Sequence, residues 1–176
     1  MYPFVRVLAA MHRAGRQPRL DPGEVHIVRT RCWPWDIDPF GELNNGRSLT
    51  LMDIGRTSLL RRSGLIERLH ARGRRITMAG SVVQYRRRVP PFADMEIRSR
   101  MLGTDARFFY IEHVTWTKGA PAHHAVYRAV AVGPEGIVPT AEALDGDDRP
   151  GWRAPLPDWV AAWSEAERLR PWPPGL

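Results

Sequence analysis

The stretch that decides the fold is Asp36-Ile37-Asp38-Pro39-Phe40-Gly41-Glu42-Leu43-Asn44-Asn45-Gly46, which leads into the apolar run Leu49-Thr50-Leu51-Met52-Asp53-Ile54-Gly55. Pro39 and Gly41 favour turns, so the two carboxylates are expected in a loop that ends at a helix. Asn44 is a good N-cap, because its side-chain oxygen can accept a hydrogen bond from the first turn. We therefore predict a helix from about Asn45 to Arg62.

The start of this helix can bind a developing negative charge. Its first N–H groups have no partner inside the helix and lie at the positive end of the helix dipole. Asp38 and the N–H of Asn45 would then lie within one turn of each other. The alternative for Asp38 is an ordinary turn residue that bonds its own backbone ahead of Pro39.

The pattern Asp-x-Asp-x-x-Gly-x-x-Asn-Asn, followed on the helix by Leu-x-Leu-Met-Asp-x-Gly-Arg, resembles the hotdog-fold acyl-CoA thioesterases related to 4-hydroxybenzoyl-CoA thioesterase. It is most similar to their thioesterase-like relatives from bacteria and animals. The segment from Gln84 to Met95 also matches, with an aromatic strand end, a proline turn and an Asp that opens the next strand. The resemblance covers roughly residues 24–133. Glu42 replaces the usual His of the family, and Ser48 replaces an aromatic residue, often Tyr.

The resemblance implies an α+β hotdog fold, in which an antiparallel β-sheet wraps around a long central helix. It also implies that Asp38 acts on the thioester carbonyl as nucleophile or general base. The backbone N–H of Asn45 would polarise that carbonyl. Gly41 and Asn44 are implied to lie against the substrate. Two protomers of the family join their sheets edge to edge with acyl-CoA at the interface, so a homodimer or a dimer of dimers is expected.

The run Arg86-Arg87-Arg88 lies at a predicted strand end. Arg86 and Arg88 are candidates to bind the phosphates of coenzyme A, because arginine forms forked, charge-assisted hydrogen bonds. A solvated edge that discourages sheet aggregation explains the run equally well. Coenzyme A is expected only as part of the substrate, and no cofactor is predicted. No metal site is predicted either, because His123 and His124 are adjacent strand residues that point to opposite faces.

Two other functions compete with thioester hydrolysis. A hydratase or dehydratase on the same fold would need a His base, and the loop has none, since His26 and His70 lie outside the motif. A non-catalytic protein that binds acyl-CoA or lipid is supported by the changes at Glu42 and Ser48. Glu42 is interpreted as a loop residue in preference to a second acid, and Asp36 as a loop residue that supports the site.

Composition bounds the class of protein and its partners. The chain has 176 residues, 43% of them hydrophobic, which fits one soluble domain with a single core. Cys32 is the only cysteine, so no intrachain disulfide can form and a cytoplasmic location is expected. The net charge of +7 favours coenzyme A or an anionic membrane surface as partner. Nucleic acid is the weakest candidate, because no zinc-ligand spacing, aromatic RNA-binding strand or recognition helix is evident. A solvated basic surface without a specific partner remains open.

The chain divides into three predicted parts: an amphipathic segment and linker (1–23), the hotdog thioesterase-like domain (24–138) and a C-terminal extension with a short helix (139–176). Residues 1–16 carry Phe4, Val7, Leu8 and Met11 at helical spacing. The segment is shorter than the ~20 residues of a membrane span, and Arg6 breaks the apolar region that a secretory signal would need. We favour packing on its own domain or on a partner subunit over contact with a membrane surface.

The remaining pattern predicts strands. The first spans 25–33, and a long one spans 76–89 with a bulge at Gly80. Strands at 95–101, 108–116 and 124–132 are joined by short turns, which predicts an antiparallel meander. Strict alternation in 95–101 predicts one wet face. A short helix around Trp159 and an extended end at 171–176 complete the chain.

Overall fold

The computed structural model describes residues 2–175. The elements are α1 (Phe4–Gly15), β1 (His26–Arg31), α2 (Asn45–Ser63), α3 (Leu65–His70), β2 (Arg75–Tyr85), β3 (Asp94–Thr104), β4 (Phe109–Thr117), β5 (Ala120–Gly133), β6 (Gly136–Val138), α4 (Thr140–Ala143) and α5 (Asp158–Arg168). Within the described residues, the strands form one antiparallel sheet in the order β1-β3-β4-β5-β2, and β6 pairs with β5. This is the predicted α+β layout.

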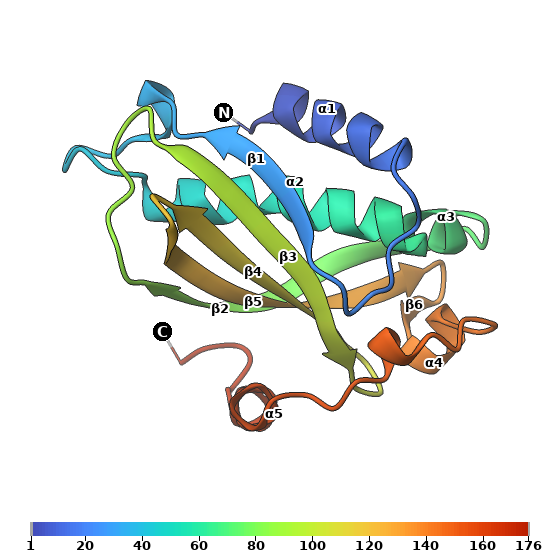
Figure 1. The fold of residues 1–176 in the computed structure, drawn as a ribbon. Helices are drawn as coiled ribbons and strands as arrows, with labels where there is room; N and C mark the ends of the chain where they lie inside the picture. Colours follow the sequence, from blue (N-terminus) through green and yellow to red (C-terminus); the bar gives the residue numbers. More distant parts are fainter. Residues whose placement is uncertain (1, 176) are drawn as a thin grey trace.

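The curved sheet wraps around α2, as Figure 1 shows. The helix is buried on several sides, with Leu51, Met52, Ile54 and Leu59 each almost fully covered. The sheet covers one side of α2 and α1 packs on another. Helix α1 therefore packs on its own domain, which is one of the two packings predicted for it.

Gly55 sets how closely α2 approaches the sheet. A Cβ atom at this position would lie 2.7 Å from Cγ2 of Ile97 and closer still to Oγ of Ser99, both on β3. No side chain fits there, so the helix backbone rests directly on these two side chains. The close approach at Gly55 is thus made by the helix backbone to two side chains and not to another backbone.

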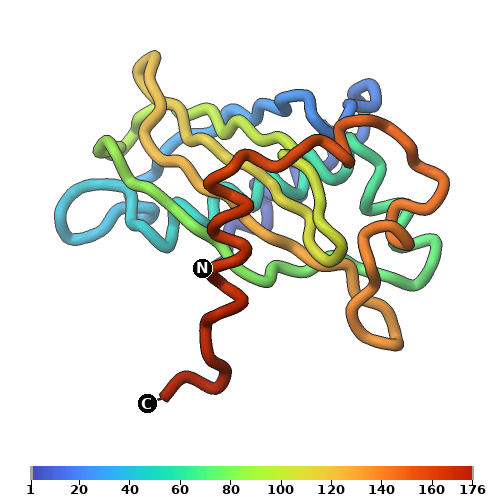
Figure 2. The backbone as a smooth tube through the Cα atoms, turned by 90° about the horizontal axis from the view of Figure 1, so that it is seen from below, coloured from blue at the N-terminus to red at the C-terminus, as the bar shows by residue number. Residues whose placement is uncertain are grey.

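The other face of the sheet is partly covered by α5, which runs across it in Figure 2. The Tyr110 hydroxyl oxygen lies 2.7 Å from Oγ of Ser164, and Arg128 pairs with Glu167 at 3.0 Å. Strand β3 alternates as predicted, with Met95, Ile97, Ser99 and Met101 buried under α2 and the intervening side chains on the wetter face.

Several boundaries differ from the prediction. The strand expected to reach Val89 ends at Tyr85, because the amides of Arg86 and Arg87 both donate to the carbonyl of Ala122 and the ladder cannot continue. The bulge at Gly80 is confirmed by a register shift after Met78. Helices α3 and α4 and strand β6 were not predicted.

Helix α1 lies at the N-terminal end of the described residues. The predicted N-terminal helix is present as α1, and the outermost residues of the predicted ends, 1 and 176, lie outside the described residues. No helix within residues 2–175 is long and apolar enough to cross a membrane. The domain boundaries at 23/24 and 138/139 stay a prediction.

Candidate active site

The buried half of the loop between β1 and α2 is built around Asp36. Its side chain is inaccessible to solvent and pairs with Arg6 of α1 at 3.0 Å and with Arg47 of α2 at 2.6 Å. The Trp33 amide donates to the same carboxylate at 3.0 Å. A buried carboxylate that binds two arginines and a backbone amide has both oxygens occupied, and its role is to stabilise the fold. Asp36 therefore joins α1, the loop and α2, in keeping with its predicted supporting role.

The outer half of the loop is a tight turn organised by Asp38. Oδ1 of Asp38 accepts from the amide of Phe40 at 2.9 Å and from that of Glu42 at 3.4 Å. The Gly41 amide donates to the Asp38 carbonyl at 3.1 Å, and Gly41 has φ of 76°, a conformation that favours glycine. Asp38 thus makes the turn contacts of the ordinary alternative. These contacts orient the carboxylate, and a catalytic role stays a prediction.

The helix start is capped as predicted. Oδ1 of Asn44 accepts from the amide of Arg47 at 3.0 Å, and the Asn44 amide donates to the carbonyl of Asp36 at 3.0 Å. Helix α2 begins at Asn45. Because the cap serves the amide of Arg47, the amides of Asn45 and Gly46 are the first-turn donors at the positive end of the dipole.

A buried hydroxyl–imidazole pair holds the first turn of α2 against β5. The Ser48 hydroxyl lies 2.7 Å from Nδ1 of His123, and Nε2 of His123 lies 3.1 Å from the carbonyl oxygen of Arg87. A carbonyl can only accept, so Nε2 carries the proton and Nδ1 accepts from Ser48. Burial lowers the pKa of His123, which favours this neutral form.

Tyr85, at the end of β2, adds a second tie to the helix start. Its hydroxyl donates to the carbonyl of Asn45 at 3.1 Å, and its ring meets the His123 ring edge to face at 5.1 Å. The first turn of α2 is therefore fixed by the edge strand as well as by β5. These contacts were not predicted: the pattern indicated an ordinary strand histidine, and no local signal joins Ser48 to a residue 75 positions away.

The structure separates the two arginines proposed to share a ligand. Arg88 pairs with Glu42 at 2.7 Å and donates to the carbonyl of Phe40 at 2.7 Å, so it lies against the loop of Asp38. Arg86 instead contacts the side chain of Gln84 at 3.4 Å. Strand alternation does not apply here, because β2 ends before this run. Glu42 is the partner of Arg88 and agrees with its interpretation as a loop residue.

Of the two histidines considered for the hydratase alternative, His26 is buried and His70 is exposed. Burial lowers the pKa of His26 to about 4 and that of His113 to about 3. His123 adjoins the helix start, but its Nδ1 already accepts from Ser48. His124 points to the other face of the sheet and pairs with Glu112, as alternation predicted. Among residues 2–175, no cluster of three or more His, Cys, Asp or Glu side chains is placed to hold a metal ion.

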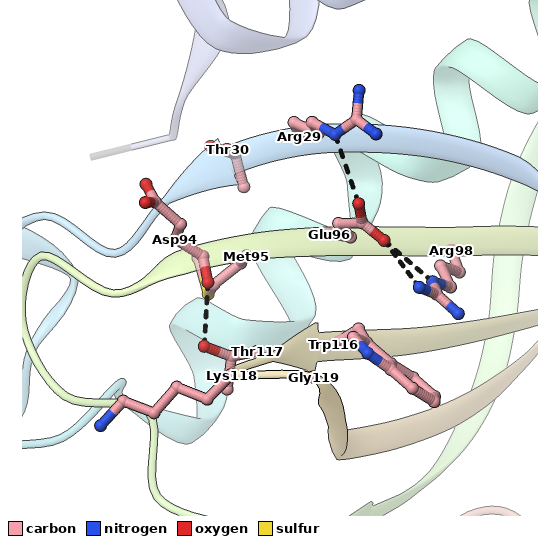
Figure 3. A pocket seen from close by; sticks show the side chains of 10 residues that line it. All are labelled: Arg29, Thr30, Asp94, Met95, Glu96, Arg98, Trp116, Thr117, Lys118 and Gly119. Atoms are coloured by element: carbon pink, nitrogen blue, oxygen red, sulfur yellow. Dashed lines mark hydrogen bonds and ion pairs between the residues drawn. The ribbon is translucent and has the colours of Figure 1, made fainter.

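A hollow of about 510 Å³ lies away from the loop, on β1, β3, β4 and the β4–β5 turn. Figure 3 shows Glu96 between Arg29 and Arg98, paired with both. The Arg98 guanidinium stacks over the ring of Trp116 at 4.1 Å. These side chains satisfy one another across neighbouring strands, and none of the predicted site residues lines the hollow.

Comparison with known proteins identifies relatives. Residues 32–164 match the family model of the thioesterase-like superfamily. Protein THEM6 of Xenopus laevis is 38% identical over 110 residues, which are 62% of this chain and 53% of that protein. Protein THEM6 of Drosophila melanogaster is 28% identical over 143 residues, or 78% of this chain and 71% of that protein. The chain thus spans about half the length of the first of these relatives.

Solved structures share the architecture. The probable thioesterase YbaW from Escherichia coli superposes with a TM-score of 0.62 at 16% identity, over 71% of this chain and 94% of that one. The DHNA-CoA thioesterase from Staphylococcus aureus gives 0.59 at 14% identity, over 82% of this chain and 92% of that one. At such identities the likeness shows the fold alone, and it confirms the hotdog fold that the resemblance implied.

Proposed function

The chain belongs to the thioesterase-like superfamily, and on that premise we propose that it hydrolyses an acyl-CoA thioester at the start of α2. The observation that carries this proposal is the pairing of an oriented carboxylate with a capped helix start in one loop. Asp38 supplies the carboxylate. The amide of Asn45 supplies the donor for the oxygen that becomes negative.

In the proposed reaction, Asp38 takes a proton from water while the water oxygen attacks the thioester carbon. The carbonyl oxygen becomes negative and accepts from the Asn45 amide. The C–S bond then breaks, and the coenzyme A sulfur leaves with the proton, which yields a carboxylic acid and a free thiol. Direct attack by Asp38 would instead give a mixed anhydride that water hydrolyses. Oδ1 is engaged with the turn, so Oδ2 is the oxygen we assign to this chemistry.

Substrate binding is proposed to involve Gly41, Asn44 and the two arginines. Arg88 is the stronger candidate for a coenzyme A phosphate, because it lies against the loop of Asp38. Arg88→Ala should raise KM more than it lowers kcat, since a phosphate contact far from the reacting carbon binds ground state and transition state alike. Arg86→Ala is the matched comparison and should raise KM less.

We also propose a homodimer, or a dimer of dimers, joined through β2. This strand ends one side of the sheet, and an unpaired edge readily accepts another strand. Light scattering that finds only a 20.1 kDa species at micromolar concentration would exclude this assembly. We place the protein in the cytoplasm, which the single, buried Cys32 supports.

The decisive experiment measures free thiol release from a panel of acyl-CoA thioesters. Asp38→Asn keeps the shape of the side chain and removes the basic oxygen, so kcat should fall by at least about 10²-fold with little change in binding. Asp145→Asn, at an exposed carboxylate in a distant loop, should keep full activity. Near-normal kcat in Asp38→Asn would overturn the assignment. Saturable binding by the wild type without thiol release would favour the non-catalytic alternative.

A further inference from the structure

Helix α1 turns its small side chains inward and its large ones outward. Its buried residues are Val7, Ala10 and Ala14. The residues we call the α1 apolar face are Phe4, Val5 and Leu8, which are 64%, 82% and 65% exposed. Single exposed apolar residues are common, but three within two turns of one helix form a continuous surface. Among the described residues, Phe4 meets the ring of Tyr2 edge to face at 4.8 Å, and all three side chains of the face stay mainly exposed.

A second exposed aromatic group, in the loop that follows β1, contacts α1 through Arg6. The guanidinium of Arg6 lies 5.9 Å from the ring centroid of Trp35, which is 68% exposed. Trp35 stacks on Trp33 at 5.4 Å, and Trp33 meets Phe92 edge to face at 6.4 Å. Exposed aromatic rings therefore lie beside α1, on the loop that holds Asp36.

The charge around this surface has one sign. The first 20 residues of the sequence contain four arginines and no Asp or Glu. Arg6 pairs with Asp36, and Arg19 lies 3.9 Å from Glu67. Arg13 and Arg16 are exposed and have no ion-pairing carboxylate in the part of the chain that the structure describes. Large apolar residues next to unpaired arginines are the pattern of a helix that lies in a membrane interface.

We propose that α1 docks its apolar face on an anionic lipid surface, with Arg13 and Arg16 contacting the lipid phosphates. The helix has 12 residues, so it lies on the membrane and does not cross it. A second copy of the chain fits less well, because its own α1 segment offers these arginines no carboxylate. The pair between Arg6 and Asp36 would join the docked helix to the loop of the candidate site.

Sedimentation of the full chain with vesicles tests this proposal. Vesicles of phosphatidylcholine mixed with phosphatidylglycerol should pull down the wild type, and vesicles of phosphatidylcholine alone should do so much less. The double variant Val5→Ser/Leu8→Ser should weaken binding at least about tenfold, because two apolar side chains no longer enter the interface. Arg13→Gln/Arg16→Gln should weaken it by about fivefold per arginine.

Matched control variants distinguish binding through the α1 apolar face from nonspecific binding through any exposed leucine or arginine. Leu169→Ser changes a leucine that is 85% exposed at the end of α5, on the other side of the molecule, and should bind as the wild type does. Arg153→Gln/Arg170→Gln removes two exposed arginines elsewhere and should weaken binding less than the α1 pair does. Failure of the wild type to bind anionic vesicles at low salt, or equal binding to neutral ones, would overturn the proposal. So would a change in the oligomeric state of Val5→Ser/Leu8→Ser without lipid, which would assign the face to a second copy.

Discussion

The loop between β1 and α2 has a buried half and an outer half, and each carries one carboxylate. Asp36, in the buried half, is held by two arginines and a backbone amide. Asp38, only two residues later, bonds through one oxygen to its own turn. A buried charge needs every available partner, so Asp36 is used for structure. A partly exposed carboxylate does not, which leaves Asp38 available for chemistry.

The largest effect on folding is expected from Asp36→Asn. The substitution leaves Arg6 and Arg47 without their shared negative charge, so the free energy of unfolding should fall by about 3 kcal/mol. Urea denaturation followed by circular dichroism measures this loss. Asp38→Asn is the matched control and should change stability by less than about 1 kcal/mol. Equal losses in the two variants would remove the distinction between the halves of the loop.

A smaller effect is expected at the first turn of α2. Ser48→Ala leaves Nδ1 of buried His123 without a donor, and the free energy of unfolding should fall by about 2 kcal/mol. Ser63→Ala removes an equally buried hydroxyl from the other end of the same helix. That hydroxyl donates to a carbonyl that the Gly64 amide also serves, so the loss should be smaller. Urea titration of both variants measures the two losses in the free energy of unfolding. A larger loss in Ser63→Ala would contradict a special role for the Ser48–His123 hydrogen bond in holding the start of α2.

The smallest effect is expected from Glu42→Gln in the outer half. Glu42 pairs with Arg88 at 2.7 Å, but the Arg88 side chain is 70% exposed, and such pairs contribute little to stability. The free energy of unfolding should change by less than about 1 kcal/mol, and high salt should erase the difference. A loss as large as that of Asp36→Asn would show that the outer half is also part of the structural frame.

The sequence predicted those features whose cause is local. The cap at Asn44, the start of α2 at Asn45 and the bulge at Gly80 each follow from residues within a few positions. The strand ending at Tyr85 was predicted too long, because the residues after it keep strand propensity while the carbonyl of Ala122 stops the ladder. Propensity does not report where a partner strand ends its pairing.

The contacts that hold the candidate site together had no local signal. Arg6 reaches Asp36 across 30 positions, and Ser48 reaches His123 across 75. Arg6 was interpreted only as a break in the apolar region of residues 1–16, although it joins α1 to the loop. Which polar residues meet is decided by how α1 and β5 pack on α2, and the periodicity of one segment carries no information about its neighbour.

Gly55 is the point at which the backbone of α2 rests on β3, so packing at this residue sets the position of the helix ends. The helix rises about 1.5 Å per residue, so the Asn45 amide lies about 15 Å along the axis from the point where the backbone rests on Ile97 and Ser99. Any side chain at residue 55 would push α2 away from β3 and tilt it, so the end of the helix at Asn45 would move by a comparable or larger distance. A small displacement of the helix at Gly55 would therefore move the Asn45 amide. That amide would have to lie within a few tenths of an ångström of its position to donate to the carbonyl oxygen of a substrate.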